Sequence, residues 1–157
     1  MKVAMLGIVA LSLAVGCGEQ PSATKVPASK QTPTMRTDAA PITRRLPKLG
    51  TLQSVWWQSD QITTNSFPSP PTHPAYRVRG LAQLEKTKAE EFSRNYEWQK
   101  MPAGWTPDIT VTNTGLSLHD WNRNAAFTKE CKPPQLSGEL LFERLSGVVY
   151  FDIEVEY

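Results

Sequence analysis

The alternation of residue types near the C-terminus constrains the fold more than any other feature of this 157-residue chain. Every second residue from 149 to 155 is apolar, and the residues between them are acidic apart from one tyrosine. The apolar set is Val149, Phe151, Ile153 and Val155, and the other set is Tyr150, Asp152, Glu154 and Glu156. Because successive side chains of a strand point to opposite faces, this pattern predicts one core face and one acidic, solvated face.

A second strand is predicted just before this one. Gly138–Arg144 and Val148–Glu156 are joined by Leu145–Gly147, a short loop with a glycine where a positive φ is often required. The two segments therefore predict an antiparallel hairpin at the C-terminus.

Further strands and one helix are predicted upstream. Alternation predicts a strand over Ala75–Leu84, and Thr87 followed by Glu90 is a capping box for a helix from Lys88 to about Tyr96, with Phe92 facing the core. The other predicted strands are Thr51–Ser59, Glu97–Met101 and Asp108–Thr112, whereas Leu116–Lys132 is assigned mostly to loop. The predicted fold class is α+β: an antiparallel sheet of about five or six strands with one short helix packed on one face.

The N-terminal segment Met1–Cys17 has a lysine, an apolar run from Val3 to Val15, small residues and a cysteine. The run is shorter than the roughly 20 apolar residues that span a bilayer, and it matches the apolar part of a secretory signal. Leu13–Cys17 (LAVGC) resembles the cleavage site of bacterial lipoproteins, although Ala14 stands where that family usually has leucine. An ordinary cleaved signal with a chance cysteine, or an uncleaved anchor, are the alternatives.

The resemblance implies cleavage between Gly16 and Cys17 and acylation of Cys17. It also implies a lipid anchor in the cell membrane or the outer membrane, with the domain on the extracytoplasmic side. Residues 1–16 are then a signal peptide. Residues 17–47, rich in proline, serine and threonine, are predicted to be a disordered linker, and residues 48–157 a globular domain.

The charge is unevenly distributed along the chain. Residues 18–47 carry five basic and two acidic residues, whereas the predicted domain has slightly more acids than bases. A nucleic-acid-binding domain would gather its basic residues on the folded surface, so no nucleic-acid partner is expected. A basic tail beside an anionic membrane is favourable.

His119 and Asp120 are adjacent and could act in catalysis, Cys131 with a histidine is a weaker candidate for a nucleophile pair, and His73 lies in a proline-rich loop. Their spacing fits no metal motif, and no phosphate loop, serine elbow or cysteine cluster is found, so neither a metal nor a cofactor is predicted. Cys131 has no partner if Cys17 is acylated, and we expect it to be buried.

The chain has five tryptophans, which is many for a small domain. Trp56 and Trp57 are adjacent in a predicted strand, so they point to opposite faces and one is a candidate for surface binding. The leading interpretation is an envelope lipoprotein whose domain is a non-enzymatic binding or structural module, with an envelope protein or glycan as partner. The alternative is a small hydrolase, or a sugar- or small-ligand-binding lipoprotein, that uses the His119/Asp120 loop and surface tryptophans.

Overall fold

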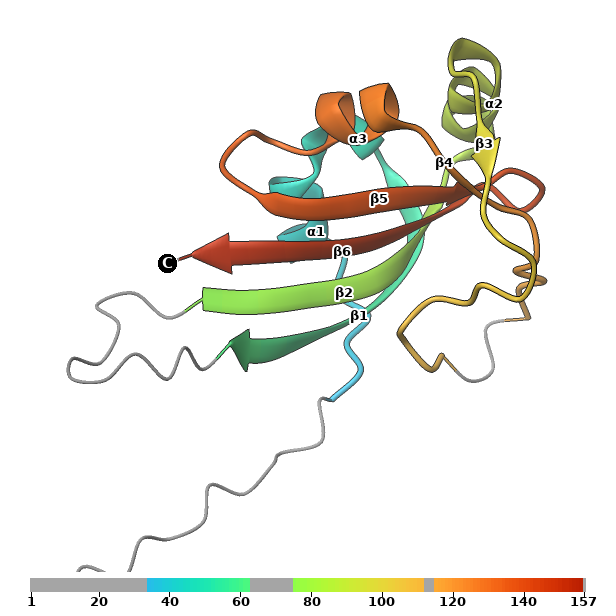
Figure 1. Ribbon diagram of the computed structural model, residues 1–157. Coiled ribbons are helices and arrows are strands. Elements are labelled where there is room, and N and C mark those ends of the chain that lie inside the picture. The colour runs from blue at the N-terminus through green and yellow to red at the C-terminus, as the bar shows by residue number, and fades with distance from the viewer. Residues whose placement is uncertain (1–33, 63–74, 112–114, 157) are drawn as a thin grey trace, which may run out of the picture. The chain divides into compact units, whose positions relative to one another are not determined.

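A six-stranded antiparallel sheet organises the protein, and Figure 1 shows its long central strands. The computed structural model describes residues 34–62, 75–111 and 115–156. The strands lie in the order β1-β2-β6-β5-β4-β3. Their bounds are β1 Leu52–Ile62, β2 Ala75–Leu84, β3 Gln99–Lys100, β4 Trp121–Arg123, β5 Ser137–Glu143 and β6 Val148–Glu156. The predicted α+β class, the antiparallel sheet and the C-terminal hairpin are confirmed.

Strand β6 is central and pairs with β2 on one side and β5 on the other. Gly80 of β2 lies opposite Phe151, and a Cβ built at Gly80 would lie 2.7 Å from the Cβ of Trp57. Glycine therefore leaves the space in which the rings of Phe151 and Trp57 pack across the middle of the sheet.

All the helices of the described residues pack on one face of the sheet, which we call the helix face. They are α1 (Ala40–Arg45), a 3-10 turn (Pro47–Leu49), α2 (Lys86–Asn95) and α3 (Ala125–Cys131). Their buried residues form one cluster with Val149, Phe151, Ile153 and Val155, as the alternation predicts. Phe92 of α2 lies in this cluster, and its ring meets the ring of Phe127 edge-on at 5.1 Å.

The predicted start of the second helix is wrong by two residues. Helix α2 begins at Lys86, and its N-cap Glu85 makes no side-chain cap hydrogen bond. Strand β2 ends at Leu84, so the chain enters the helix at once and Thr87 already lies in the first turn. The Thr87–Glu90 capping box therefore does not form.

The predicted linker is wrong for residues 34–47, the part of it that the structure describes. Ile42 of α1 and Leu46 are fully buried in the core of the helix face. Arg36 also pairs with Trp57 of β1: each backbone N–H donates to the other residue's carbonyl, at 2.7 and 2.9 Å. The domain therefore starts before Lys48. Packing of two large apolar side chains against the core is enough to hold a short helix in place, because most helical stability in proteins comes from tertiary contacts.

The opposite face is not uniformly solvated, and this corrects the prediction for Tyr150. Tyr150 is 2% exposed and lies in a second apolar cluster with Leu81, Trp121, Leu141 and Val148. Residues 101–111 and 115–118, which we call the coil cover, pack over this cluster. We call this side of the sheet the coil face.

The coil cover contains no regular strand in its described residues. The strand predicted over Asp108–Thr112 is absent from residues 108–111, and Thr112 lies outside the described ranges. Ile109 and Val111 are half-buried against the second cluster. The side chains of Ile109 and Val111 therefore cover one face of the sheet, and their backbone adds no strand to its edge.

The segment assigned to loop, Leu116–Lys132, contains β4 and α3, so that assignment is wrong for residues 121–131. Asn124 is the N-cap of α3, and its side-chain oxygen accepts a hydrogen bond from the backbone N–H of Phe127 at 2.9 Å. This cap gives the helix a defined start.

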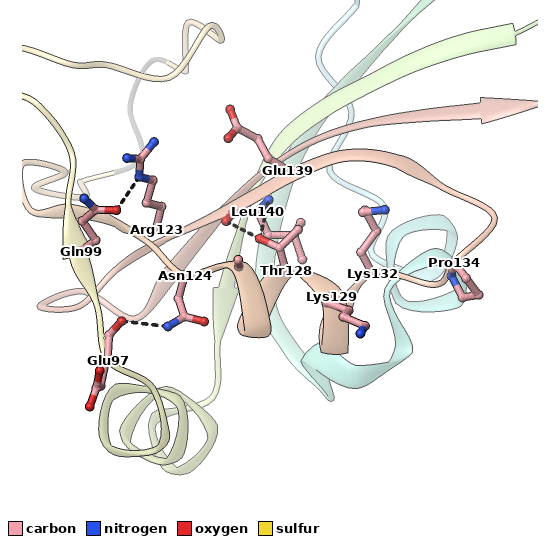
Figure 2. Close-up of a pocket in the computed structure, with 11 residues that line it drawn as sticks. Glu97, Gln99, Arg123, Asn124, Thr128, Lys129, Lys132, Pro134, Glu139 and Leu140 are labelled. Atoms are coloured by element: carbon pink, nitrogen blue, oxygen red, sulfur yellow. Dashed lines mark hydrogen bonds between the residues drawn. The ribbon is translucent and has the colours of Figure 1, made fainter.

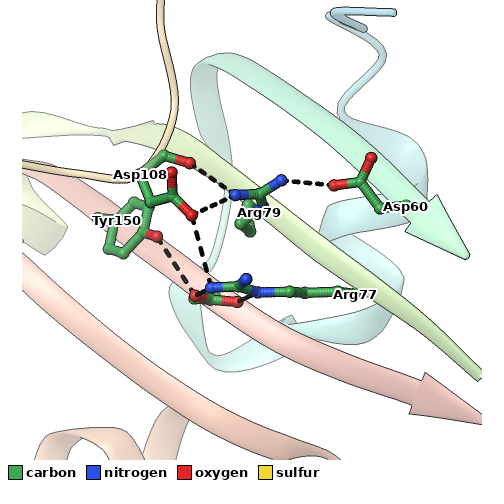
Figure 3. Close-up of polar contacts among 6 residues, drawn as sticks. Asp60, Arg77, Arg79, Asp108 and Tyr150 are labelled. Carbon is green, nitrogen blue, oxygen red and sulfur yellow. Dashed lines mark hydrogen bonds and ion pairs between the residues drawn. The ribbon is translucent and has the colours of Figure 1, made fainter. Parts of the chain in front are cut away.

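Charged side chains anchor the coil cover to the sheet (Figure 3). Arg79 of β2 donates to the carboxylate of Asp60 on β1 at 2.5 Å. It also donates to the carboxylate of Asp108 in the coil cover, and to its backbone carbonyl at 3.1 Å. One guanidinium therefore links the edge strand, its neighbour and the cover.

Arg77 extends this network to the central strand. Its guanidinium binds both carboxylate oxygens of Asp152 on β6, at 2.8 and 2.5 Å, and lies 3.7 Å from Asp108. The hydrogen bond to Asp152 raises the pKa of Arg77 above its usual range. Such two-pronged pairs are geometrically specific, so they fix where the cover meets the sheet.

Candidate functional site

The structure separates the roles of the predicted pair His119 and Asp120. His119 is exposed, whereas Asp120 is half-buried. The carboxylate of Asp120 forms a salt bridge with the ammonium group of Lys100 of β3, with 2.9 Å between Oδ1 and Nζ. The hydrogen bond from Lys100 lowers the pKa of Asp120, although burial acts against it. The backbone carbonyl of Asp120 accepts a 2.5 Å hydrogen bond from the buried Asn122 amide. His73 lies outside the described residues.

A buried carboxylate that the sequence analysis missed, Glu143, supports the same loop. Glu143 is fully buried and accepts hydrogen bonds from the backbone N–H groups of Asp120, at 3.1 Å, and Ser146, at 2.6 Å. A buried carboxylate requires such donors. The carboxylate of Glu143 therefore holds the entry to β4 and the C-terminal hairpin together, which is a structural use of this acid.

The candidate binding residues Trp56 and Trp57 are both packed into the domain. Trp57 is 4% exposed, and its indole N–H donates to the carbonyl of Asp38 at 3.0 Å. Trp56 is half-buried against the second cluster. Because the coil cover occupies the face opposite the helices, neither ring of the pair is left as a broad exposed surface.

Cys131 is fully buried, as expected, and the structure records it as a free cysteine. Burial raises the pKa of its thiol to about 12. Since the thiolate is the reactive form, a thiol with so high a pKa is a poor nucleophile at neutral pH.

An open groove of about 900 Å³ lies beside α3 (Figure 2). We call it the α3 groove. It is lined by residues of α3 and β5 and of the segments around β3 and β4: Glu97, Gln99, Arg123, Asn124, Ala125, Thr128, Lys129, Lys132, Pro134, Glu139 and Leu140.

Side-chain hydrogen bonds between neighbouring elements fix the walls of the α3 groove. The Asn124 side chain caps α3 and donates to the carbonyl of Glu97 at 2.7 Å. The hydroxyl of Thr128 donates to the carbonyl of Leu140 at 3.1 Å, and Arg123 donates to the Gln99 side chain at 2.9 Å. The groove is therefore preorganised rather than formed by loose surface side chains.

The α3 groove has both charged and apolar lining and carries a small excess of positive charge. Arg123, Lys129 and Lys132 contribute three cations, and Glu97 and Glu139 contribute two carboxylates. Lys132 also donates to the carbonyl of Leu136 beyond the end of α3. An open groove of mixed polarity suits an extended polar ligand that carries carboxylates.

The sequence analysis did not identify the α3 groove, because its residues carry no catalytic or ligand-binding motif. The available signal was Asn124 followed by Ala125, Ala126 and Phe127, an N-cap before good helix formers and an apolar residue. Placing that helix would have put Thr128 and Lys129 on one short element, with Lys132 directly after it.

Within the residues that the structure describes, no cluster of three or more His, Cys, Asp or Glu side chains could hold a metal ion. No helix in those ranges has the length and hydropathy needed to cross a membrane. Comparisons with protein-family models, with curated proteins and with solved structures found no match.

Proposed function

We propose that the chain is a membrane-anchored lipoprotein of the bacterial envelope, and that its domain is a non-enzymatic binding module. The observation that carries the anchoring is the position of Cys17, directly after small residues at the end of an apolar run. Acyl chains on this cysteine would supply about 0.8 kcal/mol of membrane affinity per buried methylene.

The binding role rests on the α3 groove. Its walls are held by hydrogen bonds between separate elements, and its three cations exceed its two carboxylates. The partner that fits is a polar, carboxylate-bearing segment of another envelope component, either protein or glycan. The contacts of Asp120 with Lys100 and Asn122 favour binding over catalysis, because they engage the carboxylate that would otherwise act beside His119.

Replacing Cys17 by serine tests the anchor. We expect Cys17→Ser to move the protein from the detergent phase to the aqueous phase, because it removes the acylation site. Cys131→Ala is the matched control: it removes the other cysteine and should leave partitioning unchanged. Detergent partitioning of Cys17→Ser like that of the unchanged protein would refute the lipoprotein proposal.

A photoreactive amino acid placed in the α3 groove tests the binding role. Substituted at Lys129, it should crosslink a defined envelope component in cells. The control position is Arg94 on α2, which is also exposed but lies outside the groove. The same products at both positions, or none at Lys129, would contradict a binding role for the groove.

A further inference from the structure

A second groove lies where α1 crosses the sheet, and its rim is strongly basic. This α1 groove has a volume of about 510 Å³. Its lining residues are Arg36, Pro41, Arg44, Arg45, Trp57, Ser59, Tyr76 and Val78. Trp57 and Val78 are buried, so the floor is apolar and ordered while the arginines stand around it.

The arginines are mounted on a fixed framework. Ile42 and Leu46 are fully buried and dock α1 on the core, which leaves Arg44 exposed on the helix. The guanidinium carbon of Arg36 lies 4.2 Å from the centroid of the Trp57 ring, and Arg45 donates to the carbonyl of Pro41 at 3.1 Å. The backbone of α1 and the side chain of Arg36 are therefore already ordered before an anion binds.

The charge of this region is opposite to that of the rest of the domain. Residues 34–50 contain four basic residues and one acidic residue, Asp38. Asp38 accepts two hydrogen bonds from Arg36 at 3.2 Å, and Arg44 and Arg45 are the other basic residues that line the groove. Residues 52–156 contain more acidic than basic residues, so an anionic surface would attract the α1 side and repel the remainder.

The α1 groove also lies at the start of the described domain, close in sequence to Cys17. Even a fully extended polypeptide between Cys17 and Thr34 reaches no more than about 60 Å. An acyl anchor at Cys17 would therefore hold α1 within that distance of the headgroup layer. This step rests on the proposed lipid anchor. The observations on the charge and on the groove are independent of it.

We propose that the α1 groove binds the anionic phospholipid surface of the membrane, with Arg44 and Arg45 pairing with headgroup phosphates. Arginine suits this role because its planar guanidinium can donate two hydrogen bonds to one phosphate. The contact would give the lipoprotein a fixed orientation, with the α1 side on the membrane.

Vesicle binding of the protein without its predicted signal peptide, residues 1–16, tests this inference without the acyl anchor, so every protein carries Cys17→Ser. The test variant adds Arg44→Gln and Arg45→Gln, and the control adds Lys86→Gln and Arg94→Gln, two exposed basic residues on α2. Vesicles of phosphatidylcholine with phosphatidylglycerol are compared with phosphatidylcholine alone. We expect the test variant to lose about 25-fold in affinity for the anionic vesicles, about fivefold per arginine, and the control much less.

Arg44→Gln alone keeps the test valid if the half-buried Arg45 is needed for folding, and it should cost about fivefold. Equal losses in test and control variants, or equal binding to both kinds of vesicle, would overturn the proposal. Unchanged binding of the Arg44 and Arg45 variants would overturn it too. So would a competition experiment in which an added acidic protein, but not added salt, releases the protein from the anionic vesicles. Because the vesicle assay does not use the acyl chains, its failure is separate from a failure of Cys17→Ser to change detergent partitioning.

Discussion

The two faces of the sheet are both covered, but by different means. The helix face is covered by regular helices whose buried residues meet a continuous row of apolar side chains on β6. The coil face is covered by residues 101–111 and 115–118, which have no regular structure in the described ranges. Its underlying strands are apolar at one end and charged at the other, where Arg77, Arg79 and Asp152 lie.

This difference shows how an irregular segment can be held in place without a backbone ladder. The coil cover relies on aromatic contacts, because the Trp105 ring meets those of Trp121 and Tyr150 edge-on at 5.8 and 5.7 Å. It also relies on the ion pairs of Asp108 with the sheet. We therefore expect the helix face to unfold with the whole domain, and the coil cover to be able to open separately.

The largest effect should come from the centre of the helix face. Phe151→Ala removes a fully buried ring that packs in the main core, so it should lower the free energy of unfolding by about 3–5 kcal/mol. Glu154→Ala, at an exposed position of the same strand, should cost no more than about 0.5 kcal/mol. Denaturant unfolding measures both, and the reverse order of the two effects would contradict the observed register.

A smaller and more local effect is expected on the coil face. Trp105→Ala should cost about 1–3 kcal/mol, because the ring is only half-buried and loses two aromatic contacts. Hydrogen exchange should accelerate mainly in residues 101–111. Trp98 is a matched half-buried tryptophan on the helix face, 5.0 Å from the rings of both Phe127 and Phe142. Trp98→Ala should instead accelerate exchange throughout the domain, and identical exchange patterns would remove the distinction between the faces.

The smallest effect concerns the ion pair that joins the two ends of the coil cover. Lys100 precedes the cover and Asp120 follows it, and the pKa of Asp120 is lowered in the folded state. A lowered pKa means that the pair stabilises the fold above the unfolded value of about 3.9, and that this stability is lost as the pH falls through the folded value. Because Lys100 is largely exposed, we expect no more than about 1 kcal/mol.

Asp120→Asn therefore should be less stable than the unchanged protein at about pH 7, with the difference shrinking toward about pH 3. Lys100→Gln is the matched variant and should show the same trend from the other partner. Denaturant unfolding across this range provides the measurement. A stability difference that does not change with pH would mean that the pair does not carry the effect.

The sequence by itself determined the secondary structure of the central strands, because the direction of each side chain along a strand follows from local backbone geometry. Alternation over most of Ala75–Leu84 and Val148–Glu156 is enough to define two strands, and the glycine-containing loop before Val148 is enough to define a hairpin. From these, the α+β class and the antiparallel sheet follow. The anchor at Cys17 also remains a prediction from the sequence, since residues 1–33 lie outside the described ranges.

Only the tertiary structure decided which residues are buried among those that lie in a polar stretch of the sequence. Tyr150 alternates with acids yet is buried, because the coil cover arrives from a distant part of the chain. Ile42 and Leu46 lie among prolines and arginines yet complete the core, because the helix face receives them. The α3 groove likewise forms only when β3, β4, α3 and β5 meet. Periodicity records the local direction of each side chain, whereas burial depends on long-range contacts that leave no periodic mark on an irregular segment.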